Sequence, residues 1–305
     1  MSALLGLLGG CLLLGTLARR SGRFPAQTPS ALNAFVLNVA LPALVLRVVH
    51  GLQVSPALLA AAAAPWAVFG GAYALVRAVG PRLGLSRESQ AALVLTAGLG
   101  NTSFVGLPMA EALLGPEGVE VAVVVDQLGS FLVLATLASW VAAREGAHAG
   151  ASARDVLRRV LTFPSFLALL VALGTRAVDY PAWLDLVLER LGALLTPLAL
   201  FSVGFSLRLS GLSAHRRALA LGLGYKMLLA PLAVGLLFLW LPAGPPVLAH
   251  ATVLQVATAP MVSAGLLAAE HRLDPELATR MVGVGLPLSL LSAPALLWLL
   301  RACGL

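Results

Sequence analysis

The sequence predicts an all-α membrane protein with ten transmembrane helices, arranged as two inverted five-helix repeats in which helices 4 and 9 are broken crossing helices. Three observations carry this prediction. The composition is 59% hydrophobic and only 11% charged, whereas a soluble domain has roughly 25% charged residues. The apolar residues fall into ten segments, each near the roughly 20 residues that cross a bilayer. Two of these segments are interrupted at corresponding places in the two halves of the chain.

The ten apolar segments are separated by short connections rich in Pro, Gly and Arg. Their expected ranges are 2–18, 30–49, 56–79, 88–112, 118–143, 161–178, 183–207, 216–240, 246–269 and 276–300. The first segment lacks a basic n-region and a small-residue cleavage site, so we expect it to be a retained span. The longest connection, 144–160, is expected to be a cytoplasmic linker whose second half forms a short surface helix. It separates a first repeat, 1–143, from a second repeat, 161–305.

Basic residues are distributed unequally between the two ends of the segments. Of the 20 Lys and Arg residues, Lys226 lies within an apolar segment and only Arg47, Arg176, Arg190 and Arg301 lie toward one side. The other fifteen lie on the opposite side, after the odd-numbered segments. The positive-inside rule then predicts a multi-pass protein of the cell (inner) membrane with both termini outside. This distribution also accounts for the net charge of +7 without a nucleic-acid partner.

The two halves carry similar interrupted segments at nearly equal offsets. NVALPALVL around Pro42 has a counterpart 155 positions later in LLTPLALFS around Pro197, and GLPM at Pro108 has one 152 positions later in TAPM at Pro260. Five segments per half is an odd number, so the two copies have opposite orientations in the membrane. Inverted repeats with interrupted helices are typical of secondary transporters, and the interruptions indicate the binding site.

The interruption in the fourth segment is GLGNTSFVGLPM at 98–109. An opened backbone within a membrane is tolerated only inside protein or beside a water-filled cavity. The half-helix that begins there presents free amides and the positive end of its dipole, and Asn101, Thr102 and Ser103 add donors without a fixed charge. These features predict an anion site that holds a carboxylate. The alternative is that Asn101 only caps a broken helix.

Asp126 and Gln127 lie deep within the fifth segment. An ionisable residue at such a depth costs about 2.5–3.5 kcal/mol on insertion scales and therefore indicates function. Asp126 is a candidate proton carrier. The equally weighted alternative is that it neutralises Lys226, which also lies near mid-depth.

Further polar residues lie near the prolines of the second, seventh and ninth segments. Asn38 lies four residues before the proline of the second segment and is a candidate for substrate binding, although a helix–helix hydrogen bond is equally expected. Gln255 and Thr258 precede the proline of the ninth segment and are candidates to complete the site. Ser202 and Ser206 follow the proline of the seventh segment, where packing between small residues is the favoured interpretation.

Four stretches of the chain resemble the auxin efflux carrier family, which includes plant auxin exporters and bacterial organic-acid carriers. They are GNTSFVGLP, FVLNVALPALV, TPLALFSVGFSL and APMVSAGLLAAEHRLDPELA. The resemblance, closest to the bacterial type, covers essentially the whole chain and is most specific at GNTSFVGLP. It implies a scaffold of segments 1, 2, 6 and 7 and a transport core of segments 3–5 and 8–10, with a crossing at Pro108 and Pro260. It also implies that Gln127 lines the substrate site, and that the protein forms a homodimer.

Enzyme motifs such as HExxH, GxSxG and GxxxxGK[ST] do not occur in the sequence, so we expect no enzyme, no metal and no cofactor. Polarity is concentrated at two breaks, which favours a carrier over a passive channel, and we expect no output domain of the kind that a ligand-binding membrane sensor carries. The resulting hypothesis is a secondary carrier in the lipid bilayer that exports or exchanges a small organic anion, auxin-like or a mono- or dicarboxylic acid. The resemblance implies an elevator-type movement. Coupling to a proton through Asp126 or no coupling is preferred over sodium, because the sequence has no acidic cluster to hold it.

Overall fold

The computed structural model describes residues 2–53, 55–146, 153–207, 215–240 and 244–302, which form helices and no β-sheet. The α-helices in this part of the chain are α1 (Ser2–Arg20), α2 (Thr28–Phe35), α3 (Leu41–His50), α4 (Pro56–Val79), α5 (Arg87–Gly98), α6 (Leu107–Val124), α7 (Ser139–Glu145), α8 (Ala153–Thr162), α9 (Pro164–Gly174), α10 (Ala182–Ala193), α11 (Leu195–Ser206), α12 (Arg216–Gly224), α13 (Ala230–Trp240), α14 (Pro246–Val256), α15 (Val262–Glu270) and α16 (Pro275–Ala302). The all-α prediction is confirmed. Residues 147–152 of the predicted linker lie outside the described residues.

Short π-helical segments join several of these helices into longer stretches. They are Val36–Ala40, Thr102–Gly106, Val125–Phe131, Leu134–Ala138 and Tyr225–Leu229. Six continuous stretches of the described residues are long and apolar enough to cross a membrane: Thr28–His50, Pro56–Leu83, Thr102–Glu145, Ala182–Ser206, Arg216–Trp240 and Pro275–Ala302. The chain is therefore a multi-pass membrane protein. The longest of the six bends at Gly115, whose φ of 72° and ψ of −162° are not helical.

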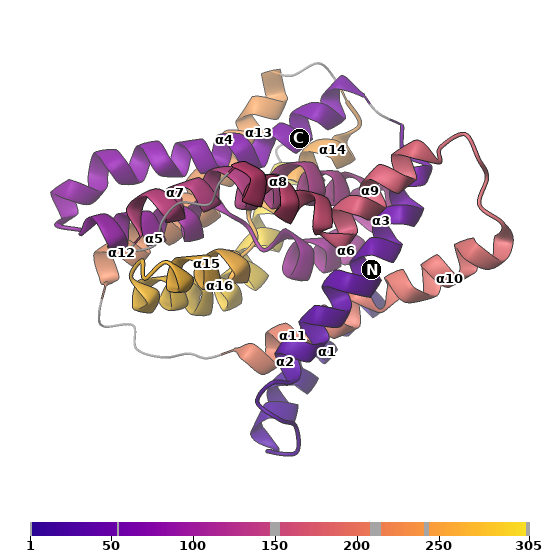
Figure 1. The fold of residues 1–305 in the computed structure, drawn as a ribbon, viewed down its shortest axis with the longest axis horizontal. Coiled ribbons are helices and arrows are strands. Elements are labelled where there is room, and N and C mark those ends of the chain that lie inside the picture. The colour runs from indigo at the N-terminus through magenta and orange to yellow at the C-terminus, as the bar shows by residue number, and fades with distance from the viewer. Residues whose placement is uncertain (1, 54, 147–152, 208–214, 241–243, 303–305) are drawn as a thin grey trace.

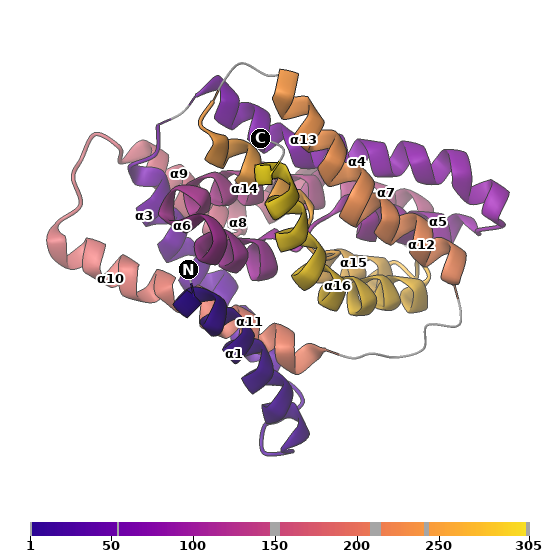
Figure 2. The ribbon, with the colours of Figure 1, turned by 180° about the vertical axis from the view of Figure 1, so that it is seen from behind.

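The helices form two groups (Figures 1 and 2). In one, which we call the α11 group, α1 and α2 pack against α11, and α3 packs against α9 and α10. In the other, the α14 group, α6 packs against α14, α4 against α5, and α16 against α5 and α15; α7, α12 and α13 complete this group. Contacts of α6 with α1, α3 and α11 connect the two groups.

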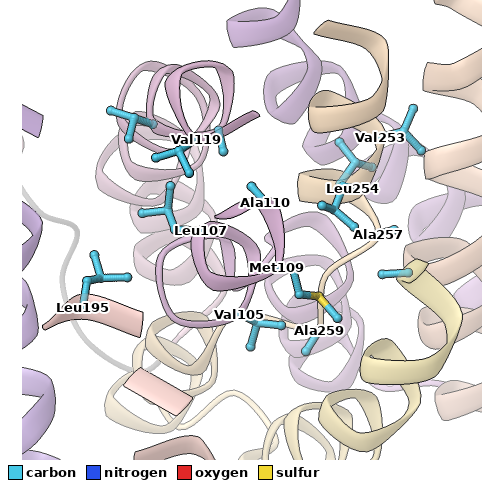
Figure 3. Packing of buried hydrophobic residues seen from close by; sticks show 14 of the residues in the cluster. Val105, Leu107, Met109, Ala110, Val119, Leu195, Val253, Leu254, Ala257 and Ala259 are labelled. Carbon is cyan, nitrogen blue, oxygen red and sulfur yellow. The ribbon is translucent and has the colours of Figure 1, made fainter. Parts of the chain in front are cut away.

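The largest buried cluster lies where the two groups meet. Figure 3 shows Val105 of the stretch Thr102–Gly106, and Leu107 and Met109 at the start of α6, between Leu195 of α11 and the residues around Leu254 of α14. Lipid tails are as apolar as these side chains, so the contact is held by close packing of the side chains rather than by the exclusion of water. This packing holds the start of α6 between the two groups.

Candidate functional site

Two interrupted helices meet beside this cluster. One gap separates α5 from the helical stretch that begins at Thr102, and the other separates α14 from α15. The two gaps run antiparallel, and Gly100 pairs with Pro260. Pro108, which the resemblance assigns to the crossing, lies in the first turn of α6, eight residues after Gly100.

Two backbone hydrogen bonds flank this pair. The amide of Asn101 donates to the carbonyl oxygen of Ala259 at 2.8 Å, and the amide of Met261 donates to the carbonyl oxygen of Leu99 at 3.0 Å. Each gap thus supplies partners for backbone groups that the other has lost from its helix. This exchange is what an opened backbone at membrane depth requires.

A cavity of about 560 Å³ lies between the two helical groups. It is lined by α2 and α11 on one side and by the helical starts after both gaps, together with α16, on the other. Its polar lining residues are Ser30, Asn33, Asn101, Ser202, Ser206 and Ser263. The other lining residues are apolar or glycine, and none of the described residues that line the cavity is charged. On the described part of its lining, a ligand in this cavity therefore meets neutral polar groups and apolar surface.

Both helical starts open onto this cavity. Asn101 and Phe104 line it from the stretch that begins after the first gap, and Val262 and Ser263 line it from α15. The amides of a first helical turn have no partner within the helix, and this end carries the positive pole of the helix dipole. Two such ends at one cavity form a site that can bind an anion without a basic side chain.

Asn101 connects the helical start to the cavity. Its Oδ1 accepts a hydrogen bond from the amide of Phe104 at 3.4 Å, so the residue caps the helix. Its Nδ2 is buried and has no hydrogen-bond partner among the described residues. A buried donor without a partner costs about 1–3 kcal/mol. The structure therefore leaves one donor of the predicted binding residue free for a ligand.

Asp126 lies behind the same helical start and does not line the cavity. Its side chain is buried, and Oδ1 accepts hydrogen bonds from the hydroxyls of Thr102 and Ser103, the latter at 2.6 Å. Gln127 Nε2 donates to Oδ2 at 2.8 Å. Thr102 and Ser103, predicted as donors to the substrate, thus donate to Asp126 instead. Gln127 also lies away from the cavity, and its Oε1 has no partner among the described residues.

Lys226 lies on the other side of the paired gaps and is 1% exposed. Its Nζ donates to the carbonyl oxygen of Val256, the last residue of α14, at 2.7 Å. A methyl group on Gly100 would lie 2.9 Å from this Nζ and 2.7 Å from Thr258 Oγ1, so the close approach requires glycine. In the described part of the chain, no ion pair joins Lys226 to Asp126.

The remaining predicted residues are not lining residues of this cavity. Asn38 is exposed, and its Nδ2 donates to the carbonyl oxygen of Ala34, one turn earlier, at 2.7 Å. Gln255 and Thr258 are fully buried beside the second gap. Thr258 Oγ1 donates to the carbonyl oxygen of Gln255 at 2.7 Å, whereas the Gln255 side chain has no hydrogen-bond partner among the described residues.

Sequence reasoning missed the polar residues that α2 contributes. Ser30 and Asn33 line the cavity, and Asn33 Oδ1 accepts a hydrogen bond from Ser202 Oγ at 2.6 Å. Ser202 and Ser206, which were assigned to packing, also line the cavity. The i, i+3 spacing of Ser30 and Asn33, which places both on one helical face, is the signal that could have identified them.

Comparison with known proteins shows which proteins the chain is similar to. The family model described as "Membrane transport protein" matches residues 10–297. An uncharacterized transporter of Methanothermobacter thermautotrophicus is 26% identical over 294 residues, which cover 94% of this chain and 93% of the relative. An uncharacterized transporter of Methanocaldococcus jannaschii is 30% identical over 128 residues, or 40% of each chain.

Proposed function

Since the chain belongs to the membrane transport protein family and is a transporter rather than an enzyme, we propose that it is a secondary carrier of a small organic anion, which it exports or exchanges. The observation that carries this proposal is the pair of helical starts that open onto one cavity whose described lining residues are all uncharged. The first-turn amides of α15, the positive ends of both helix dipoles and Asn101 Nδ2 bind a carboxylate of an auxin-like, mono- or dicarboxylic acid. The apolar lining accommodates the rest of the molecule.

In this proposal, the α14 group carries the anion past the α11 group in an elevator-type movement. The α14 group is the transport core, the α11 group is the scaffold, and the ten predicted spans form two inverted repeats, 1–143 and 161–305. The position of the cavity between the two groups supports this division, because a ligand there contacts both. The protein is placed in the cell membrane with both termini outside and works as a homodimer.

The cavity lies toward the end of the molecule that carries most arginines. Its lining includes Ser30, near the start of α2, and Ser206, the last residue of α11. Arg19 and Arg20 end α1, and Arg23 lies in the connection from α1 to α2. The positive-inside rule assigns this side to the cytoplasm, so the arrangement corresponds to a carrier ready to load an anion from the cytoplasm.

Uptake of labelled malate, malonate and indole-3-acetate into proteoliposomes tests the proposal. The wild type should show saturable uptake and counterflow, which a passive channel lacks. Asn101→Ala should reduce uptake at least about tenfold, because it removes a hydrogen bond to a charged group, worth about 1.5–3 kcal/mol. Asn38→Ala is the matched control, since Asn38 is exposed and bonds its own helix. Equal activity of the two variants, or transport of none of these acids, would refute an anion site at the gap.

A further inference from the structure

The carbonyl ends of the two broken helices point to a second charged site, on the opposite side of the gaps from the cavity. The last carbonyls of a helix lack partners within it and carry the negative end of its dipole. In many transporters, such ends of interrupted helices coordinate the coupling cation. In this protein, the carbonyl oxygen of Val256 at the end of α14 accepts a hydrogen bond from the Lys226 ammonium.

The end of α5 lies at the same place. Gly98, the last residue of α5, and Val256, the last of α14, line one small void together with Lys226. The hydroxyl-bearing residues Thr102 and Ser130 line it as well. The void has a volume of about 10 Å³, at the lower limit of the roughly 10–15 Å³ that one water molecule needs. A hydrated cation therefore has no room while the lysine side chain is in place.

The surroundings of Lys226 lack a carboxylate partner within the described structure. The buried carboxylate of Asp126 accepts hydrogen bonds from Thr102, Ser103 and Gln127 and not from Lys226. A charged side chain at membrane depth is costly and marks a function. Here the partner in the described structure is the backbone carbonyl of Val256. Backbone carbonyls are ligands of monovalent cations as well as acceptors for an ammonium.

We propose that the Lys226 ammonium is a tethered monovalent cation that occupies the site which the carbonyl ends of α5 and α14 would otherwise offer to Na⁺ or K⁺. The carrier consequently needs neither ion to hold the two gaps together. Shortening the side chain would turn the same carbonyls into a site for a free cation. The statement about transport rests on the proposed carrier function, whereas the statement about ion binding does not.

Thermal unfolding of the full-length protein in detergent tests the ion site without any substrate. The midpoints should be measured in NaCl, KCl and choline chloride at equal ionic strength. The wild type should have the same Tm in all three salts. Lys226→Ala and Lys226→Ser should have a lower Tm in choline and regain at least about 3 °C, saturably, with Na⁺ or K⁺. Lys226→Met, which refills the space without a charge, should not respond to either ion.

Several outcomes would overturn the proposal. Saturable stabilisation of the wild type by Na⁺ or K⁺ would show that the site is not occupied by Lys226. If Lys226→Ala and Lys226→Ser fold but respond to neither cation, shortening the side chain opens no cation site. If neither variant can be obtained as folded protein in NaCl or in KCl, this result also contradicts the proposal. Uptake assays in the same salts separate this inference from the carrier function. If the wild type transports an acid but the Tm of the variants does not respond to Na⁺ or K⁺, only the tethered-cation proposal is rejected. If the wild type transports none of the acids but the Tm of the variants does respond, only the anion-carrier proposal is rejected.

Discussion

Asn101 uses its two side-chain atoms for different purposes, since Oδ1 caps a helix and Nδ2 is buried without a partner among the described residues. Asn101→Ser separates capping from binding. A serine caps about as well as an asparagine and brings no charge into the buried site, so the Tm should stay within about 3 °C of the wild type. Its shorter side chain has no amide donor at the position of Nδ2, so uptake should fall at least about tenfold. A variant that is stable and fully active would leave capping as the role of Asn101.

The Asp126 carboxylate is a second residue-scale feature, because three side-chain donors converge on it. Asp126→Asn should lower the free energy of unfolding by about 1–3 kcal/mol. The asparagine keeps one acceptor oxygen, and its NH₂ group would face a donor in place of the second oxygen, so buried donors would lose their partner. The measurement is the Tm, compared with that of Gln127→Ala, which removes only one of the three donors. A larger loss in the glutamine variant would contradict this hydrogen-bonding scheme.

Gly100 tests the contact between the gaps. Gly100→Ala should destabilise the protein and reduce uptake, because its methyl group would lie 2.7 Å from Thr258 Oγ1 and 2.9 Å from Lys226 Nζ. Gly70→Ala is the matched control, since a Cβ there meets nothing within 4 Å in the helix α4, where alanine is the better helix former. Similar Tm values for the two variants would show that the gaps do not approach as closely as described.

At the residue scale, the sequence predicted the location of the site better than the direction of its side chains. The cluster of glycine and polar residues predicts an opened backbone at 98–109, and Asn101 does line the cavity. The sequence cannot show that Thr102 and Ser103 donate to Asp126, because Asp126 belongs to another helical segment, whose position depends on tertiary packing. Asn33 was missed for the same reason, since its partner Ser202 lies 169 residues away.

At the scale of elements, helix ends with a local signal were predicted best. The expected range 56–79 equals that of α4, where Ser55 caps the helix and Pro56 begins it. The expected range 161–178 contains the shorter α9, because Leu161 belongs to α8 and Phe163 is extended. Within the predicted break at 98–109, the opened backbone precedes Pro108, because a proline fits the first turn of a helix.

The contact between α1 and α11 gives a prediction at this scale. A Cβ at Gly15 would lie 2.1 Å from the carbonyl oxygen of Phe201, whereas a Cβ at Gly9, also in α1, meets nothing within 4 Å. Gly15→Val should therefore force the helices apart and lower the Tm by several degrees, because small residues permit such close packing in membranes. Gly9→Val should have a much smaller effect on Tm. The reverse order would contradict the packing of this pair.

For the whole molecule, composition and the length of the apolar segments predicted the all-α, multi-pass membrane class, because no soluble core needs so many apolar residues and a segment of about 20 of them crosses a bilayer as a helix. The division into the α11 and α14 groups was implied only by the family resemblance. Hydropathy reports how much apolar surface a segment has, and it does not report which segment will pack against it. The two groups and the cavity between them therefore required the structure.

A hydrogen bond between the two groups allows the proposed movement to be tested. Glu111 of α6 accepts from Thr196 Oγ1 of α11 at 2.5 Å. Glu111→Cys with Thr196→Cys, in a background without Cys11 and Cys303, should lose uptake at least about tenfold when a short bifunctional thiol reagent bridges the pair, and regain it on reduction. The bridge prevents one group from sliding past the other.

The control for this experiment is a pair within one group. Arg47 of α3 contacts Glu189 of α10 at 3.1 Å, and both helices belong to the α11 group. Bridging Arg47→Cys with Glu189→Cys should leave uptake nearly unchanged. Full activity of the bridged pair at Glu111 and Thr196 would exclude a sliding movement between the groups.

Lys226 and Asp126 both belong to the α14 group, and this has a consequence for membrane voltage. With both side chains ionised, their charges sum to zero, and proton exchange between them leaves that sum unchanged. This pair of buried side chains would then add no electrical work to a movement of the α14 group, whereas a bound anion would add its own charge. A membrane potential of 100 mV acts on each such charge with about 2.3 kcal/mol. The ligand would therefore make the loaded step of the cycle more sensitive to voltage than the buried pair alone does.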